Sequence, residues 1–181
     1  MKKCLVVIDM QIDFVTGALG TSEAVRIIPA VCDCIRKAAA EKADILYTMD
    51  THTDGYLSTA EGKNLPVPHC LQGTPGWELC PEVQACLPKN AIGFKKETFG
   101  SRQLFEYAAQ QGYDFLELCG VCTDICVISN ALGLKAFLPE AEICVLASAC
   151  AGVTPESHSN ALRSMRACQI QVEQEGCIEV L

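Results

Sequence analysis

The stretch Gly120-Val121-Cys122-Thr123-Asp124-Ile125-Cys126-Val127 decides how this chain is interpreted. It follows the apolar run Tyr113 to Leu118 and leads into Ile128 to Leu132, which predicts a strand, a tight turn and a helix. Cys126 then lies near the first turn of that helix, where free N–H groups and the helix dipole favour a thiolate. A nucleophilic cysteine is one interpretation, and a small apolar core cysteine is the other.

Apolar runs and helical patterns alternate along the rest of the chain. Strands are predicted near Lys3–Ile8, Asp44–Met49, Ala91–Lys95, Phe115–Leu118, Glu142–Leu146 and Gln169–Val172, and helices near Glu23–Lys42, Ser101–Gln111, Asp124–Phe137 and Pro155–Ala167. This alternation predicts a three-layer α/β fold with a mostly parallel six-stranded sheet flanked by helices. At 181 residues, we expect one domain over residues 1–181.

Composition narrows the choice of partners and compartment. The formal net charge is −8 and no basic stripe stands out, so we expect no nucleic-acid partner. No apolar run approaches the ~20 residues that a membrane-spanning helix needs, so we expect no membrane partner. Thirteen scattered cysteines predict a reducing compartment, the cytoplasm, rather than a disulfide framework. Cys119 and Cys122 form a C-x-x-C pair, but Cys119 ends a strand instead of starting a helix, which argues against thioredoxin-like chemistry.

Chemically active residue types follow several predicted strands. In a parallel sheet these positions share one edge, so we expect Asp9, Lys96 and Cys126 to meet there. A carboxylate beside a thiol can accept its proton, and a nearby ammonium stabilises the resulting anion. The sequence therefore predicts a Cys-Asp-Lys nucleophilic site, although Asp9 alone would also suit a turn.

Residues 50–80 form a long predicted loop rich in Gly, Pro, Thr and Asn, and such a loop is unusual unless it is functional. Asp50 and His52 alternate along an extended segment and therefore point the same way, and Glu61 and His69 follow. Two nitrogen donors with one or two carboxylates suit zinc, iron or manganese. The other interpretation is a solvated polar loop. His158, on the last helix, is predicted to be an ordinary surface residue.

Five pieces in order along the chain carry a family resemblance. They are Val7 to Phe14, Asp50-Thr51-His52, Pro68-His69-Cys70 with Gly73 to Gly76, Lys96 through Phe99-Gly100-Ser101, and Gly120 to Val127. With them the chain resembles the cysteine hydrolases that include isochorismatases and nicotinamidases, and the residues of the metal site resemble the nicotinamidase branch.

The resemblance implies a role for each matching residue. Cys126 would be the nucleophile, Asp9 the general base and Lys96, rather than Lys95, the third catalytic residue. The N–H groups of Cys122 and Cys126 would form the oxyanion hole, with a cis bond between Val121 and Cys122. Phe14, Leu65 and Val121 are expected to line the substrate pocket, and Asp50, His52, Glu61 and His69 to bind a divalent metal ion (zinc, iron or manganese).

The implied reaction is hydrolysis of nicotinamide to nicotinic acid and ammonia through a thioester. Many nicotinamidases have an aromatic residue where this chain has Pro66, so hydrolysis of another small amide, a carbamoyl compound or a vinyl ether stays open. A non-catalytic metal- or thiol-binding module on the same fold is a third interpretation. Families of this kind commonly assemble as homo-oligomers, and we expect the same here.

Overall fold

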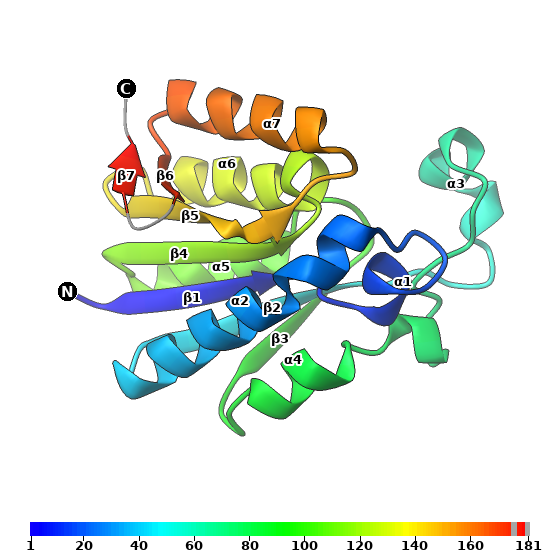
Figure 1. Cartoon of the computed structure of the whole chain (residues 1–181), viewed down its shortest axis with the longest axis horizontal. Coiled ribbons are helices and arrows are strands. Elements are labelled where there is room, and N and C mark those ends of the chain that lie inside the picture. The colour runs from blue at the N-terminus through cyan, green and yellow to red at the C-terminus, as the bar shows by residue number, and fades with distance from the viewer. Residues whose placement is uncertain (175–176, 180–181) are drawn as a thin grey trace.

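A parallel sheet forms the centre of the computed structural model, which describes residues 1–174 and 177–179. The sheet order is β3-β2-β1-β4-β5-β6-β7, and β1 to β6 all run parallel (Figure 1). The strands are β1 (Lys3–Ile8), β2 (Asp44–Asp50), β3 (Ile92–Lys96), β4 (Phe115–Val121), β5 (Glu142–Ala151), β6 (Gln171–Gln174) and β7 (Cys177–Glu179). The predicted α/β fold with six mainly parallel strands is confirmed, and a short antiparallel β7 extends it at the β6 edge.

The order of the strands reverses at the centre of the sheet. The chain moves outward from β1 to β2 and β3, and it then returns to place β4 on the other side of β1. In open parallel sheets, ligands bind beyond the carboxyl ends of the strands at such a reversal. The reversal between β1 and β4 therefore marks where a site is expected.

Helices cover both faces of the sheet. On one side α2 packs against β1, β2, β4 and β5, with α4 beside it; on the other, α6 packs against α5 and α7 (Figure 1). The helices are α1 (Ile12–Val15), α2 (Ser22–Ala40), α3 (Ala60–Asn64), α4 (Pro81–Cys86), α5 (Arg102–Gln111), α6 (Ile128–Phe137) and α7 (Pro155–Ala167). Among the described residues, no helix combines the length and the apolarity needed to cross a membrane.

Local sequence explains where the long helices begin and which face they bury. The side chain of Thr21 accepts a hydrogen bond from the amide of Ala24 and so caps α2. Thr154 caps α7, where Pro155 occupies the first turn with a suitable φ. In α2 the buried positions recur three or four residues apart, as expected for an amphipathic helix with one face on the sheet: Ala24, Ile27, Val31, Cys32, Ile35 and Ala38.

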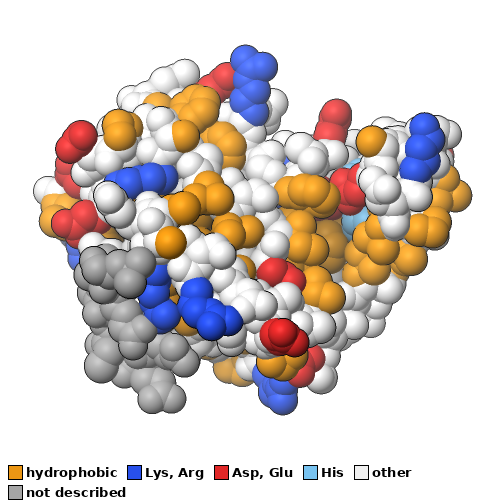
Figure 2. Space-filling model, turned by 90° about the horizontal axis from the view of Figure 1, so that it is seen from above, with side chains coloured by type: hydrophobic (Ala, Val, Ile, Leu, Met, Phe, Trp, Pro, Cys, Tyr) orange, Lys and Arg blue, Asp and Glu red, His pale blue; other side chains and the backbone are white. Residues whose placement is uncertain are grey.

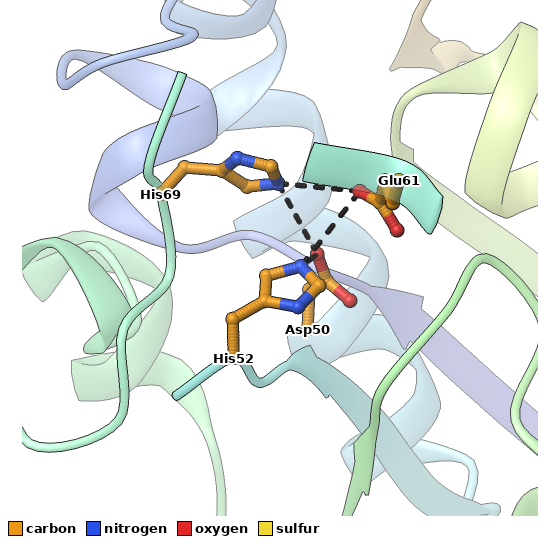
Figure 3. Close-up of side chains that lie close together, drawn as sticks. All are labelled: Asp50, His52, Glu61 and His69. Carbon is orange, nitrogen blue, oxygen red and sulfur yellow. Dashed lines mark hydrogen bonds and ion pairs between the residues drawn. The ribbon is translucent and has the colours of Figure 1, made fainter. Parts of the chain in front are cut away.

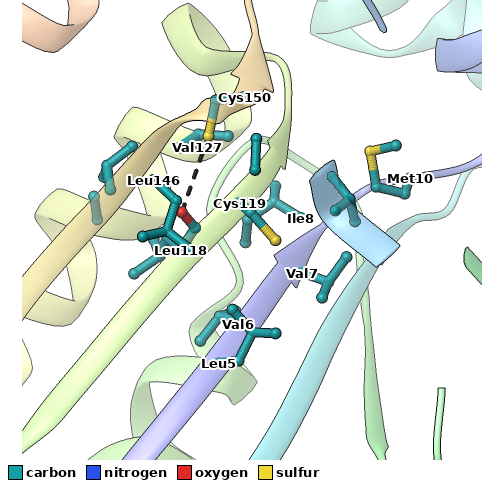
Figure 4. Close-up of a cluster of buried hydrophobic side chains, with 14 of the residues drawn as sticks. Leu5, Val6, Val7, Ile8, Met10, Leu118, Cys119, Val127, Leu146 and Cys150 are labelled. Carbon is teal, nitrogen blue, oxygen red and sulfur yellow. Dashed lines mark hydrogen bonds between the residues drawn. The ribbon is translucent and has the colours of Figure 1, made fainter. Parts of the chain in front are cut away.

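The core lies on both sides of β1, whose residues from Cys4 to Ile8 are all buried (Figure 4). Near the sheet reversal, Leu118 and Cys119 of β4 lie close to this strand, and the thiol of Cys150 donates to the carbonyl of Leu118. Most described cysteines are buried, and all twelve with described side chains are free thiols. Most of the cysteines therefore serve as small apolar residues.

The predicted long loop between β2 and β3 has structure of its own. It holds the short helices η1 (Tyr56–Ser58), α3, η2 (Pro75–Trp77) and α4, and α3 extends away from the sheet in Figure 1. The helix predicted to start at Asp124 begins instead with η3 (Thr123–Val127), a wide π-type turn in which the Val127 amide donates to the Cys122 carbonyl. This turn places Cys126 two residues before the start of α6.

Candidate active site and metal centre

Four strand ends converge at the carboxyl edge of the sheet. Asp9 directly follows β1, Asp50 ends β2, Lys96 ends β3, and Cys126 lies in the turn after β4. Asp50 and Lys96 are also paired in register between β2 and β3. The site is therefore assembled by the parallel register, and the structure brings together the three side chains predicted for a Cys-Asp-Lys site.

Lys96 is the centre of this cluster. Its Nζ lies 2.7 Å from Oδ2 of Asp9, 3.1 Å from Oδ1 of Asp50 and 3.6 Å from Sγ of Cys126. Asp9 is 0 %, Lys96 4 % and Cys126 5 % exposed. One buried ammonium therefore contacts two carboxylates and a thiol, with little water to screen the charges.

The carboxylate of Asp9 is oriented by its backbone and by Thr48. Asp9 has a φ of 47°, a left-handed conformation that turns the chain directly after β1. The hydroxyl of Thr48 donates to Oδ1 of Asp9 over 2.7 Å, and Oδ2 lies 2.7 Å from Nζ of Lys96. The carboxylate of Asp9 is also within hydrogen-bond reach of the Cys126 thiol, so it can receive the proton of that thiol. Thr48 was not predicted from the sequence, because a threonine inside a strand gives no signal of this contact.

Burial sets the protonation of the thiol. It raises the pKa of Cys126 well above its usual value; the negative charge of Asp9 adds to this, and the charge of Lys96 opposes it. Burial also raises the pKa of Asp9, with Lys96 opposing the effect and Asp50 adding to it. Burial therefore opposes the thiolate that the helix start alone would favour. A nucleophile at this position needs a base, and Asp9 lies beside it.

The turn between β4 and Cys126 has the expected backbone. The peptide bond between Val121 and Cys122 is cis, as the resemblance implied, and Gly120 has a φ of 117°. At Gly120 a side chain is excluded, because an added Cβ would lie 2.1 Å from the carbonyl oxygen of Ile8. The role of the Cys122 and Cys126 amides as an oxyanion hole stays a prediction.

The four predicted metal ligands also come together (Figure 3). The donor atoms of Asp50, His52, Glu61 and His69 all lie within 4.8 Å of one another. Oδ2 of Asp50 is 2.9 Å from Nε2 of His52 and 3.5 Å from Nε2 of His69, and Oε1 of Glu61 is 3.8 and 3.7 Å from these nitrogens. Among the described residues, no other group of three or more such side chains has this geometry.

Hydrogen bonds behind the four donors fix their orientation. Nδ1 of His69 contacts the carbonyl of Val67 over 2.8 Å, which leaves Nε2 facing the other donors. The side chain of Gln11 accepts from the amide of Asp50 and donates to the carbonyls of Asp50 and Trp77. Gln11 is fully buried, so it rigidly joins the end of β2 to the loop. It belongs to the motif from Val7 to Phe14, but sequence reasoning assigned it no role.

A cavity of about 240 Å³ lies between the thiol and the metal-site residues. In Figure 2, histidine and acidic side chains are visible in a hollow bordered by hydrophobic ones. Its lining is mainly apolar, holds no lysine or arginine, and consists of Phe14, Leu19, Thr21, Asp50, Glu61, Leu65, His69, Phe99, Cys122, Ile125, Cys126 and Val153. Phe14 and Leu65, which the resemblance assigns to a substrate pocket, are therefore lining residues of this cavity, and their contact with a substrate stays a prediction.

Two predicted positions need correction. Val121 is 1 % exposed and is not among the cavity-lining residues, because it ends β4, pairs with Ala151 and belongs to the core. Cys122 and Ile125 line the cavity instead. His158 is half-buried rather than an ordinary surface residue, and its Nδ1 is 2.8 Å from Oγ1 of Thr123. Burial lowers the pKa of His158, and its contact with Thr123 supports the start of η3.

Comparisons with known proteins agree with this geometry. The isochorismatase domain family matches residues 3–175. The nicotinamidase/pyrazinamidase of Mycobacterium tuberculosis is 26 % identical, over 94 % of this chain and 97 % of its own length. An isochorismatase family protein of Bacillus subtilis is 30 % identical, over 90 % of this chain and 93 % of its own.

A solved structure shares the fold and its title names a metal. The pyrazinamidase of Pyrococcus horikoshii in complex with zinc superposes with a TM-score of 0.84 and 32 % identity, covering 96 % of this chain and 99 % of its own. Sequence and fold thus agree over nearly the whole length, and the chain belongs to the isochorismatase family.

Proposed function

We propose that this chain is a metal-dependent cysteine amidohydrolase that converts nicotinamide to nicotinic acid and ammonia. The observation that carries the proposal is the placement of the Cys126 thiol, with Asp9 and Lys96 beside it, at one side of the cavity that also contains three of the four metal-site residues. Two relatives whose names and titles specify nicotinamidase or pyrazinamidase activity support this substrate class.

The chemistry follows from the contacts of the thiol. Asp9 would take the proton of Cys126, and the thiolate would attack the carboxamide carbon to form a tetrahedral oxyanion near the amides of Cys122 and Cys126. Collapse of this intermediate breaks the C–N bond, and the amine leaves as ammonia with the proton that Asp9 held. Asp9 then takes a proton from water, which hydrolyses the thioester and restores the thiol. Lys96 would hold Asp9 in place throughout, since the two are 2.7 Å apart.

The donor set fits a divalent metal ion. Two imidazole nitrogens and two carboxylate oxygens suit zinc, iron or manganese better than calcium or magnesium. When bound, the ion would supply a Lewis-acidic position for the ring nitrogen of the substrate and so orient the ring. Zinc is the ion named for the Pyrococcus horikoshii structure, and it is our first choice here.

The lining of the cavity favours a neutral aromatic amide over the rival substrates. Its walls are mainly apolar, and Asp50 and Glu61 are the charged residues among the lining side chains. A substrate that carries a carboxylate, such as an isochorismate-like ether or a carbamoyl amino acid, would find no lysine or arginine among these lining side chains to pair with. Phe14 offers a flat aromatic face and Leu65 an apolar side chain to a neutral ring instead.

The proposal extends to the setting of the enzyme. The twelve described free thiols support a reducing compartment, the cytoplasm, where nicotinic acid would enter NAD salvage. Apolar side chains exposed near the cavity, such as Phe99 and Val153, support a homo-oligomer. The expected single domain spans residues 1–181.

A panel assay for ammonia release tests the proposal. Nicotinamide and pyrazinamide should be hydrolysed, benzamide should be hydrolysed with a higher KM because it lacks the ring nitrogen, and a carbamoyl amino acid should not react. A nicotinoyl adduct on Cys126, trapped by acid quench and found by peptide mass spectrometry, would support the thioester. Absence of ammonia release and of any adduct, in protein loaded with zinc, iron or manganese in turn, would favour a non-catalytic binding module.

A further inference from the structure

Asn130 is a buried polar side chain that contacts three backbone groups in two segments around the cavity. It is 0 % exposed and is the third residue of α6. Its Nδ2 donates to the carbonyl of Cys126 over 2.7 Å and to the carbonyl of Phe99 over 3.0 Å. Its Oδ1 accepts a hydrogen bond of 2.9 Å from the amide of Ser101. Both amide hydrogens and the oxygen are therefore used, which fixes the side chain in one orientation.

Each of the three partners is close to the chemistry. The Cys126 carbonyl belongs to the candidate nucleophile, and Phe99 lines the cavity. Ser101 caps α5 by accepting from the amide of Leu104, so its position also sets where α5 begins. The segment from Lys96 to Ser101 is thereby held between the end of β3 and the side chain of Asn130.

The wide turn explains why a side chain is needed here. In η3 the Val127 amide donates to the Cys122 carbonyl, so the turn is wider than an α-helical turn. Two side chains one turn further on bind the carbonyls that follow: Ser129 Oγ donates to Ile125 over 2.6 Å, and Asn130 donates to Cys126. Side-chain donors thus support the backbone at the point where the candidate nucleophile leaves the turn.

We propose that Asn130 is a positioning residue, which fixes the thiol of Cys126 and the Phe99 wall of the cavity relative to each other. The effect of Asn130 on turnover rests on the proposed function. Its effect on the position of the thiol near Asp9 and Lys96 follows from the hydrogen bonds described above.

Two substitutions separate the contacts. Asn130→Ala removes all three hydrogen bonds. Asn130→Ser keeps a hydroxyl that can donate to the carbonyl four residues earlier, as Ser129 does to Ile125, but it is too short to bridge to Phe99. We expect Asn130→Ala to lower kcat by about 10- to 100-fold, the scale expected when a reacting group shifts by about 1 Å. We expect Asn130→Ser to keep kcat within about threefold and to raise KM, because the carbonyl of Phe99 at the cavity wall loses its hydrogen bond to residue 130.

Alkylation of Cys126 by iodoacetamide gives a readout that does not need turnover. Its rate, followed by peptide mass spectrometry, should fall about tenfold or more in Asn130→Ala, because the thiol moves away from the Asp9 carboxylate that takes its proton, and should stay near wild type in Asn130→Ser. The matched control is Tyr113→Phe, which removes a hydrogen bond from a buried side chain to Asp44 at the opposite end of the sheet. It should lower the melting temperature without changing the alkylation rate.

The outcomes are distinguishable. An unchanged or faster alkylation of Cys126 in folded Asn130→Ala, or an equal loss in Tyr113→Phe, overturns the positioning role. If Asn130→Ala does not fold, unchanged KM in Asn130→Ser overturns the link to Phe99. If the wild type releases no ammonia from any amide, the proposed function fails while the alkylation comparison still decides the role of Asn130.

Discussion

Replacement of Lys96 by methionine should destabilise the protein strongly, because it leaves two buried carboxylates without their shared cation. Methionine is an unbranched, flexible side chain that fills space without a charge. In the structure, Nζ of Lys96 lies 2.7 Å from Asp9 and 3.1 Å from Asp50, and it is almost fully buried. The substitution therefore removes attraction from both carboxylates and leaves their mutual repulsion.

The size of the effect follows from these distances. At an effective dielectric constant of about 20, the two contacts correspond to about 6 and about 5 kcal/mol of Coulomb attraction. Much of this attraction offsets the cost of removing the charges from water, and breaking a buried pair by deleting one partner costs about 3–5 kcal/mol in practice. For a chain of this length, that loss lowers the melting temperature by roughly 6–20 °C.

Thermal and urea unfolding of wild type and Lys96→Met, with and without bound metal, measure this cost. The loss should be smaller in the metal-loaded protein, because the ion compensates the charge of Asp50. A double-mutant cycle with Asp9→Asn isolates the pair, and the double variant should recover about 1–3 kcal/mol relative to the sum of the single losses. A Lys96→Met protein within 1 kcal/mol of wild type, or an additive cycle, would refute the view that Lys96 neutralises this cluster.

Three further predictions concern the thiol, the metal and a charge away from the site. Cys126→Ala should abolish ammonia release and leave melting temperature and metal content near wild type; retained turnover would contradict the nucleophile assignment. His69→Ala should bind less metal, as measured by elemental analysis, and its KM should rise. Removal of the metal from the wild type with a chelator should raise KM in the same way. Full activity of verified metal-free protein would contradict this prediction. Burial raises the pKa of Glu117, so its charged form is disfavoured in the folded state. This lowers the free energy of unfolding at pH values above the ordinary carboxyl pKa, where the side chain is charged in the unfolded chain. Glu117→Gln should therefore be more stable than wild type at pH 7, by up to ~1 kcal/mol in urea unfolding, and this gain should vanish near pH 4. An equal gain at both pH values would show that the charge of Glu117 is not its cause.

The sequence was sufficient to predict where strands end, and the site depends on those ends. Asp9, Asp50 and Lys96 each follow or finish a strand, and parallel strands bring their carboxyl ends to one edge. The approach of Lys96 to within about 3 Å of both carboxylates therefore follows from register rather than from details of packing. The metal-site residues were equally accessible to sequence reasoning, because Asp50 and His52 alternate along an extended segment.

Other features could not be predicted because they depend on contacts between distant segments. Gln11, Thr48 and Asn130 lie within motifs or elements, and nothing local shows that their side chains reach across to Asp50, Asp9 and Phe99. The effect of burial on the pKa of Cys126 was missed for the same reason. A helix start is visible in sequence, whereas full burial beside a carboxylate is a property of the assembled fold.

The strand order also has a consequence for how the protein gains activity as it folds. β1 pairs with β2 on one side and with β4, which lies far along the chain, on the other. The thiol after β4 can approach Asp9 only once this distant pairing has closed, and closing such long loops is entropically slow compared with forming local helices. In a refolding chain, the helical circular dichroism signal should therefore return before activity. A nascent chain whose β4 is still inside the ribosome would carry no exposed, activated nucleophile.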